Sequence, residues 1–261
     1  MKLLLLQTDI AWQQPEANRK RAELLIEASP KADLIILPEM FTTGFVASPK
    51  GEAEPPCGET FEWMRRVAQT KDAALAGSII TEENAKYYNR MYFVKPDGSY
   101  SIYDKRHLFT FAGEDKNYSH GSKRVVVEYM GFRILLQICY DLRFPVFSRN
   151  RGDYDMIIYS ANWPIPRTKV WDTLLRARAI ENACYVVGVN RVGSDPYCQY
   201  KGRSVLLDYK GREVTAVGLS EECALCNSIK KEDLLDFRKK FPVLNDADDF
   251  ELSLNTTSQK A

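Results

Sequence analysis

Residues 133–145 constrain the fold more than any other stretch of the chain. The apolar run at 135–138 is typical of a strand that is covered on both faces. Pro145 cannot extend that strand but suits the first turn of a helix. The sequence therefore predicts a core strand that ends at Cys139, just before a helix. Ligands bind at such strand ends in open α/β sheets, although a free cysteine is more often only a small buried hydrophobe.

Other predicted core strands also end at polar or ionisable side chains. The residues that follow the four apolar runs are Glu39, Cys139, Asn162 and Asn190. If the strands are parallel neighbours, we expect these side chains to converge on one rim of the sheet.

Strands alternate with helices along most of the chain, and hairpins interrupt the alternation. Asp97-Gly98, between two alternating runs, is a strong hairpin signal. The pattern favours an α/β fold of packed layers with mixed sheets. Strands are expected at 3–10, 32–37, 74–81, 91–94, 100–103, 125–129, 132–138, 154–160, 185–190, 204–208, 213–217 and 224–229. Helices are expected from Pro15 to before Pro30, from about Thr60, and over 167–183 and 231–240.

Three local expectations concern the packing of these elements. The helix over 167–183 is expected to bury one apolar face, made of Val170, Leu174, Ala177 and Ile180. The strand over 224–229 is expected to join the 204–217 hairpin as a third antiparallel strand, and residues 113–121 are expected to form a polar loop.

Size and charge narrow the class of protein. A chain of 261 residues that is 45% hydrophobic can bury one substantial core, so we expect a single domain over 1–250. The formal net charge of +1 suggests no nucleic-acid partner. The apolar run Leu3–Leu6 is too short for a signal peptide, and no stretch is long enough to span a membrane. We expect a cytoplasmic protein whose tail, 251–261, is disordered.

The six cysteines indicate reduced thiols rather than a disulfide framework. Cys223 and Cys226 have the spacing of a zinc or redox pair, but no second pair exists and the chain has only two histidines. Both cysteines also fall in or beside a predicted strand, so a structural role is expected and no metal site is predicted.

A catalytic Cys139 would need a base, because the thiolate is the nucleophile. His107 and His120 both lie upstream in polar sequence, whereas a papain-like histidine lies downstream. Glu39 is the remaining candidate, although a free thiol and a free glutamate differ by roughly 4 pKa units, or about 6 kcal/mol. Burial of the glutamate and a nearby cation such as Lys105 would narrow that gap.

Three sequence blocks together resemble the nitrilase superfamily of carbon-nitrogen hydrolases. They are Leu37-Pro38-Glu39, Tyr103-Asp104-Lys105-Arg106-His107-Leu108, and Cys139-Tyr140-Asp141-Leu142-Arg143-Phe144-Pro145. Their order and spacing fit the superfamily, and the resemblance extends from residue 1 to about Phe250. Among its members, the chain looks most like the bacterial omega-amidases, which hydrolyse the terminal amide of 2-oxoglutaramate and 2-oxosuccinamate.

The resemblance implies a Glu39-Lys105-Cys139 triad in a four-layer α-β-β-α sandwich that pairs as a dimer. Glu39 would act as the base and Cys139 as the nucleophile. Lys105 and the backbone N–H of Tyr140 would hold the oxyanion, and ammonia would leave from a tetrahedral intermediate to give a thioester. Glu114 matches a second glutamate that lines such sites. The resemblance implies no metal or cofactor.

Further residues are candidates for binding substrate. Arg143 and Arg167 could bind a substrate carboxylate, and Asn162, Trp163 and Phe41 could line the pocket. The triad alone does not separate an omega-amidase from a hydrolase of other small amides, carbamoyl-amines or nitriles. An inactive family member that binds a metabolite or a partner is the alternative from a different class.

Overall fold

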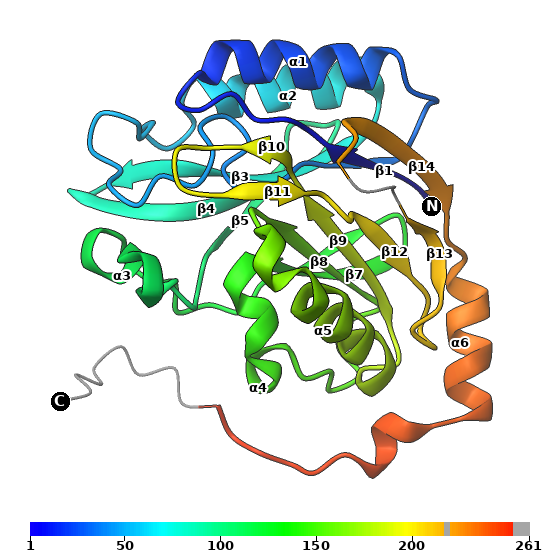
Figure 1. The fold of residues 1–261 in the computed structure, drawn as a ribbon. Coiled ribbons are helices and arrows are strands. Elements are labelled where there is room, and N and C mark those ends of the chain that lie inside the picture. Colours follow the sequence, from blue (N-terminus) through cyan, green and yellow to red (C-terminus); the bar gives the residue numbers. More distant parts are fainter. Residues whose placement is uncertain (217–219, 253–261) are drawn as a thin grey trace, which may run out of the picture.

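The computed structural model describes residues 1–216 and 220–252. Two six-stranded mixed sheets dominate the fold, and a two-stranded ribbon lies beside them (Figure 1). The first sheet has the order β14-β1-β2-β3-β4-β5, and the second has the order β13-β12-β9-β8-β7-β6.

The strands of the first sheet are β1 Lys2–Gln7, β2 Leu34–Ile36, β3 Ala74–Glu83, β4 Lys86–Val94, β5 Tyr100–Asp104 and β14 Cys223–Ser228. Those of the second are β6 Val126–Tyr129, β7 Phe132–Ile138, β8 Met156–Ala161, β9 Tyr185–Asn190, β12 Val205–Leu207 and β13 Glu213–Ala216. The ribbon consists of β10 Val192–Ser194 and β11 Gln199–Lys201. The α-helices are α1 Pro15–Glu27, α2 Glu59–Lys71, α3 Glu114–Asn117, α4 Pro145–Ser148, α5 Thr168–Glu181 and α6 Lys231–Lys240.

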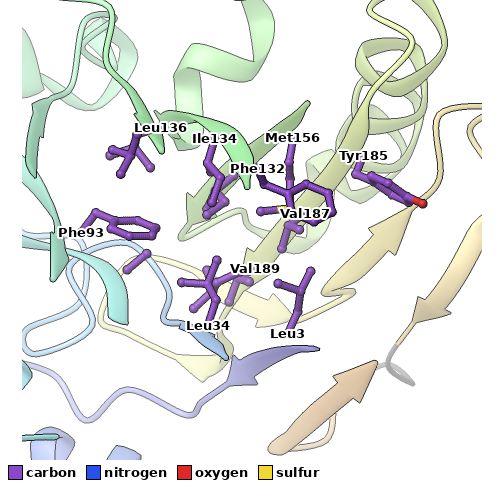
Figure 2. Close-up of a cluster of buried hydrophobic side chains, with 14 of the residues drawn as sticks. Leu3, Leu34, Phe93, Phe132, Ile134, Leu136, Met156, Tyr185, Val187 and Val189 are labelled. Carbon is purple, nitrogen blue, oxygen red and sulfur yellow. The ribbon is translucent and has the colours of Figure 1, made fainter. Parts of the chain in front are cut away.

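The two sheets pack face to face, and helices cover their outer faces. Alternation along β1 shows how: Leu3 and Leu5 point into the core between the sheets, whereas Leu4 and Leu6 pack under α1 and α2. Figure 2 shows the core between the sheets, where Leu3, Leu34 and Phe93 face Ile134, Val187 and other side chains of the second sheet. On the far side, α5 packs against β9 (Figure 1). The predicted four-layer α-β-β-α sandwich is confirmed.

Parallel pairing determines where the strand ends meet. In the second sheet, β7, β8 and β9 are parallel neighbours, and in the first sheet β1, β2 and β3 are parallel. The 3₁₀ turn Cys139–Arg143 and α4 follow β7, with Pro145 at the first position of α4 as expected. The carboxyl ends of β7, β8 and β9 therefore lie along one edge.

Several local predictions were wrong. Strand β14 pairs antiparallel with β1 in the first sheet and does not join the β12–β13 hairpin. The buried face of α5 is Trp171, Leu175, Arg178 and Ala179, while Ile180 is 53% exposed. The buried Arg178 interrupts the apolar pattern and so conceals this face in the sequence. The polar loop over 113–121 contains a short helix, α3.

Two further predictions concern the C-terminal tail and the absence of a membrane-spanning segment. Of the tail expected to be disordered, residues 253–261 lie outside the described part of the chain, and Leu252 packs against the core between the sheets. Among the described residues, none of the helices combines the length and the apolar composition needed to cross a membrane.

Candidate active site

Glu39 lies just beyond β2 and is completely buried. Its Oε1 accepts hydrogen bonds from Lys105 Nζ at 2.9 Å and from Asn89 Nδ2 at 2.8 Å. Its Oε2 accepts the backbone N–H of Asn162 at 2.9 Å, and Asn162 Nδ2 donates to the Glu39 carbonyl at 2.7 Å. Asn162 follows β8, so Glu39 connects the first sheet to the strand ends of the second. The four strand-end residues thus converge as expected, but across two sheets rather than within one.

Lys105 follows β5 and is 1% exposed. Its ammonium lies between two carboxylates, at 2.9 Å from Glu39 and 2.9 Å from Glu114. Burial lowers the pKa of Lys105, but the carboxylates of Glu114 and Glu39 outweigh it, so the pKa is raised well above the ordinary value. Lys105 therefore stays protonated.

Glu114 opens α3 and is fully buried. Besides Lys105, it accepts the backbone N–H of Phe109, and Asn89 Nδ2 lies 3.3 Å from its Oε1. Burial raises the pKa of Glu114, and Lys105 offsets only part of that rise. The second glutamate predicted by resemblance thus lies directly against the lysine.

Cys139 stands at a sharp turn directly after β7, with a φ of +42°. Met40, directly after Glu39, has the same unusual φ of +42°. Positive φ is unfavourable for side chains of these sizes and is concentrated at functional sites. Burial and the neighbouring Glu39 raise the pKa of the Cys139 thiol well above its usual range, although Lys105 acts in the opposite direction. Cys139 is therefore a thiol at rest, with the side chain of Glu39 beside it.

Asp141 holds the turns that carry Lys105 and Cys139 together. This fully buried carboxylate accepts hydrogen bonds from Tyr103 OH at 2.7 Å, from the N–H of His107 at 2.9 Å and from the N–H of Ile138 at 2.9 Å. The residues that flank Lys105 and Cys139 therefore share one anchor. His107 Nδ1 also contacts this carboxylate at 2.8 Å, which accounts for the histidine in the sequence block.

A cavity of about 580 Å³ opens above Cys139 and Lys105. Arg143, Arg167 and Trp163 line it, together with Asn162 and Tyr140. The Arg143 guanidinium lies 5.3 Å from the Trp163 ring, and that of Arg167 lies 5.1 Å from the Phe109 ring. Within the described residues, neither arginine has an acidic side chain within 4 Å. The remaining lining residues are Trp12, Gln13, Phe45, Val46, Ala47, Ser48, Phe109, Phe111, Ala112, Pro164, Asp195, Tyr197, Cys198 and Tyr200.

Some expectations for the pocket were wrong or incomplete. Phe41 does not wall the cavity but packs under α2 against Trp63. Asn89 and Asp141 were missed, although a lone asparagine in the strand-like run 86–94 and an aspartate two residues after Cys139 were signals that could have been followed.

The Cys223 and Cys226 pair does not form a joint site. The two residues are three positions apart on β14, so their side chains point to opposite faces of the sheet. Cys226 packs toward the α1–α2 layer. In the ranges 1–216 and 220–252, no group of three or more His, Cys, Asp or Glu side chains could hold a metal ion.

Comparison with known proteins shows the family to which the chain belongs. The family model for carbon-nitrogen hydrolases matches residues 3–238. The chain is 45% identical to omega-amidase YafV of Yersinia enterocolitica, over 96% of this chain and 98% of the relative. It is 36% identical to 2-oxoglutaramate amidase of Bacillus subtilis, over 92% and 95%. A CN-hydrolase superfamily protein of Xanthomonas campestris, solved with an arsenic adduct in its active site, superposes with a TM-score of 0.94 at 40% identity, over 97% and 99%.

Proposed function

The chain belongs to the carbon-nitrogen hydrolase family, and we propose that it releases ammonia from small monoamides of 2-oxo dicarboxylic acids, namely 2-oxoglutaramate and 2-oxosuccinamate. The observation that carries this proposal is a single cavity that is lined by Cys139, Lys105 and two arginines. Such substrates carry an amide at one end and a carboxylate at the other. Because Arg143 and Arg167 have no acidic partner among the described residues, either can bind that carboxylate.

The amide end would react at Cys139. Glu39 takes the thiol proton, and Sγ attacks the amide carbonyl carbon. The oxyanion that forms is held by Lys105 Nζ and by the N–H of Tyr140. That N–H lies in the first turn after β7, where backbone donors lack an intrahelical acceptor. Glu39 then returns the proton to the amide nitrogen, the C–N bond breaks, and ammonia leaves a thioester.

Water would complete the cycle. Glu39 removes a proton from a water molecule that attacks the thioester carbonyl, and the C–S bond breaks. The carboxylic acid product leaves and the thiol regains its proton from Glu39. The reaction consumes one amide and one water and yields one acid and one ammonia.

The surrounding charges explain why a carboxylate can act as the base here. Glu39, Lys105 and Glu114 form a buried cluster beside Cys139. Transfer of the thiol proton to Glu39 moves one negative charge from Glu39 to Cys139, so the number of buried charges does not change, and Lys105 favours the thiolate. Asn162 and Asn89 orient the Glu39 carboxylate for this exchange.

The proposal is tested by ammonia release from a panel of compounds. The panel contains 2-oxoglutaramate, 2-oxosuccinamate, glutamine, asparagine, an aliphatic amide, a nitrile and a carbamoyl-β-alanine, with Cys139→Ala as the control. Turnover of the 2-oxo amides that is lost in Cys139→Ala is the expected result. Preference for the nitrile or the carbamoyl compound would replace the substrate assignment, and turnover that survives in the variant would contradict the thiol mechanism.

We also propose a setting for the enzyme. Six free cysteines, including the nucleophile, support a reducing compartment such as the cytoplasm. The core shared by both sheets supports a single domain over 1–250. The outer face of α5, where Ile180 is 53% exposed, supports a homodimer formed through the helix layers.

A further inference from the structure

Arg191 is a completely buried arginine that lies behind one wall of the cavity and that the proposed reaction does not use. Its Nε donates to the carbonyl of Val192 at 3.0 Å. Its Nη2 donates to the carbonyls of Ile10 at 2.8 Å and Ser194 at 3.2 Å. The guanidinium also lies 4.6 Å from the ring of Tyr200, which lines the cavity. One side chain thus contacts segments that are far apart in the sequence.

Two of these contacts hold segments that form the cavity wall. The carbonyl of Ile10 directly precedes the stretch that brings Trp12 to the cavity. The carbonyl of Ser194 directly precedes the turn between β10 and β11, which brings Tyr197 to the cavity. The rings of Trp12 and Tyr197 lie 5.9 Å apart, edge to face, so these segments also meet at the cavity.

A third segment meets Arg191 at Gly44. A Cβ built on Gly44 would lie 3.2 Å from Arg191 Nη1 and 3.2 Å from the Trp12 ring, and the φ of Gly44 is +75°. Residues 45–48, which follow, all line the cavity. Glycine is therefore needed here both for the backbone conformation and for the close approach of Arg191.

The charge of Arg191 is only weakly compensated. Its nearest carboxylate, Asp9, lies 3.5 Å away and is 46% exposed. Nη1 is buried and has no hydrogen-bond partner within the described residues. Burial of a charge is costly unless other interactions offset it. The interactions that remain are those with the three carbonyls and with the ring of Tyr200. The buried guanidinium therefore holds these segments together.

The neighbouring residue, Asn190, holds another part of the cavity wall. Asn190 Oδ1 accepts the N–H of Trp163 at 2.7 Å, and Asn190 Nδ2 donates to the Trp163 carbonyl at 2.9 Å. Asn190, the last residue of β9, and Arg191, which follows it, therefore each hold a different part of the cavity wall. Arg191 makes none of its hydrogen bonds to Glu39, Lys105 or Cys139.

We propose that Arg191 is a positioning residue that fixes the wall made by residues 10–13, 44–48 and 194–200, and that it thereby governs substrate affinity rather than the chemical step. The proposal rests on the proposed function only for the identity of the substrate. A looser wall would weaken binding in the ground state and the transition state alike. This is the signature of a raised KM with an unchanged kcat.

The test compares Arg191→Lys and Gly44→Ala with the wild type. Lysine keeps the charge but cannot reach three carbonyls at once, and the Gly44→Ala methyl group disturbs the same junction without removing the arginine. We expect KM for 2-oxoglutaramate to rise about tenfold in each variant, with kcat within about twofold. A fall in kcat at unchanged KM, or no change in either constant in a folded variant, would overturn the proposal.

Arg238→Lys is the matched control. Arg238 also holds two carbonyls, those of Tyr154 and Ala183, and contacts a carboxylate, Asp155. Unlike the segments that Arg191 holds, neither Tyr154 nor Ala183 lines the cavity. We expect Arg238→Lys to lower stability and leave KM unchanged. If it raised KM as much as Arg191→Lys, general loosening of the fold would explain both results and the proposal would be wrong.

A second readout does not depend on the substrate assignment. Iodoacetate carries a carboxylate and alkylates thiols, so its saturable inactivation of the enzyme, with modification of Cys139 verified by mass spectrometry, reports on the wall directly. We expect the half-saturating concentration to rise in both variants with the limiting rate unchanged. If the wild type releases no ammonia from 2-oxo amides, the proposed function fails while this readout still decides on Arg191. If Arg191→Lys does not fold, Gly44→Ala decides between the same outcomes.

Discussion

Glu39 has two roles that are hard to separate, because it positions its neighbours and is also the proposed base. It receives hydrogen bonds from Lys105, Asn89 and Asn162, so removal of the whole side chain would leave buried donors unpaired. A substitution that keeps the shape of the Glu39 side chain is therefore needed to separate its role in proton transfer from its role in positioning.

Glu39→Gln is the first residue-scale prediction. The amide oxygen can still accept from Lys105, but the side chain can no longer take the thiol proton. We expect kcat to fall about 100-fold or more, the usual size of a general-base effect, with the fold intact. Single-turnover ammonia release, with circular dichroism as the check on folding, measures this. Activity within a few-fold of the wild type would show that another group takes the proton.

The sequence identified some site residues and missed others for a physical reason. Glu39 and Cys139 follow apolar runs, Lys105 follows a hairpin arm, and all three stand in short sequence blocks, so local patterns point to them. Asn89 and Asp141 matter through hydrogen bonds to residues 50 and 38 positions away, to Glu39 and Tyr103 respectively. No local pattern encodes contacts of that kind.

At the scale of elements, the position of α5 depends on one glycine in β9. A Cβ built on Gly188 would lie 2.5 Å from a methyl carbon of Leu175 and 2.7 Å from the Trp171 ring. Glycine therefore lets α5 lie close against the sheet. In turn, α5 holds the turn Cys139–Arg143 through Arg178, whose Nη2 donates to the Leu142 carbonyl at 2.6 Å.

Gly188→Ala should therefore destabilise the protein. Overpacking of this kind costs roughly 1–3 kcal/mol. We expect a lower urea midpoint with an unchanged slope, because the exposed area on unfolding stays the same. An unchanged midpoint would mean that α5 shifts outward at no cost.

Asp155 anchors another element, the charged helix α6. This fully buried carboxylate contacts Arg133, Lys231 and Arg238 within 3.1 Å. Burial raises the pKa of Asp155, but the hydrogen bonds from Arg133 and Lys231 outweigh this and lower the pKa to about 2. A lowered carboxyl pKa stabilises the fold fully above the unfolded value of 3.8, and this stability is lost as the pH falls through about 2.

Asp155→Asn removes both the anchor and its titration. Three cations lose their partner, so we expect a loss of about 3–5 kcal/mol at pH 7. The unfolding free energy of the variant should also depend less on pH between about 4 and 2 than that of the wild type. Urea unfolding at pH 7 and pH 3 tests both points. If the unfolding free energies of the two proteins depended equally on pH, Asp155 would not be the group whose titration causes this dependence.

At the scale of the whole molecule, the face of α5 that the sequence assigned to the core is only partly covered, although Val170 and Leu174 pack against the core. Val170, Leu174 and Ala177 are half-buried, and Ile180 is exposed. An apolar stripe left on the outer helix layer fits the proposed homodimer.

Ile180→Asp tests that assembly. A charge in an apolar contact between copies would have to be desolvated, so we expect the variant to be monomeric under conditions in which the wild type is dimeric. Sedimentation velocity measures this, and circular dichroism verifies that the fold is retained. A wild type that is itself monomeric, or a dimer that tolerates the aspartate, would contradict pairing through this face.

The sequence by itself determined the element types, the α/β class and the three blocks that mark Glu39, Lys105 and Cys139. These follow from periodicity, from proline and glycine positions, and from short motifs, all of which are local. Only the tertiary structure decided that β14 pairs with β1, that α5 buries Arg178 instead of Ile180, and that Glu39 reaches the site from the other sheet. These outcomes depend on contacts between residues that are distant in the sequence, such as Lys2 and Ser228, which are 226 positions apart. The surrounding fold sets the energy of such a contact, so the local sequence does not contain it.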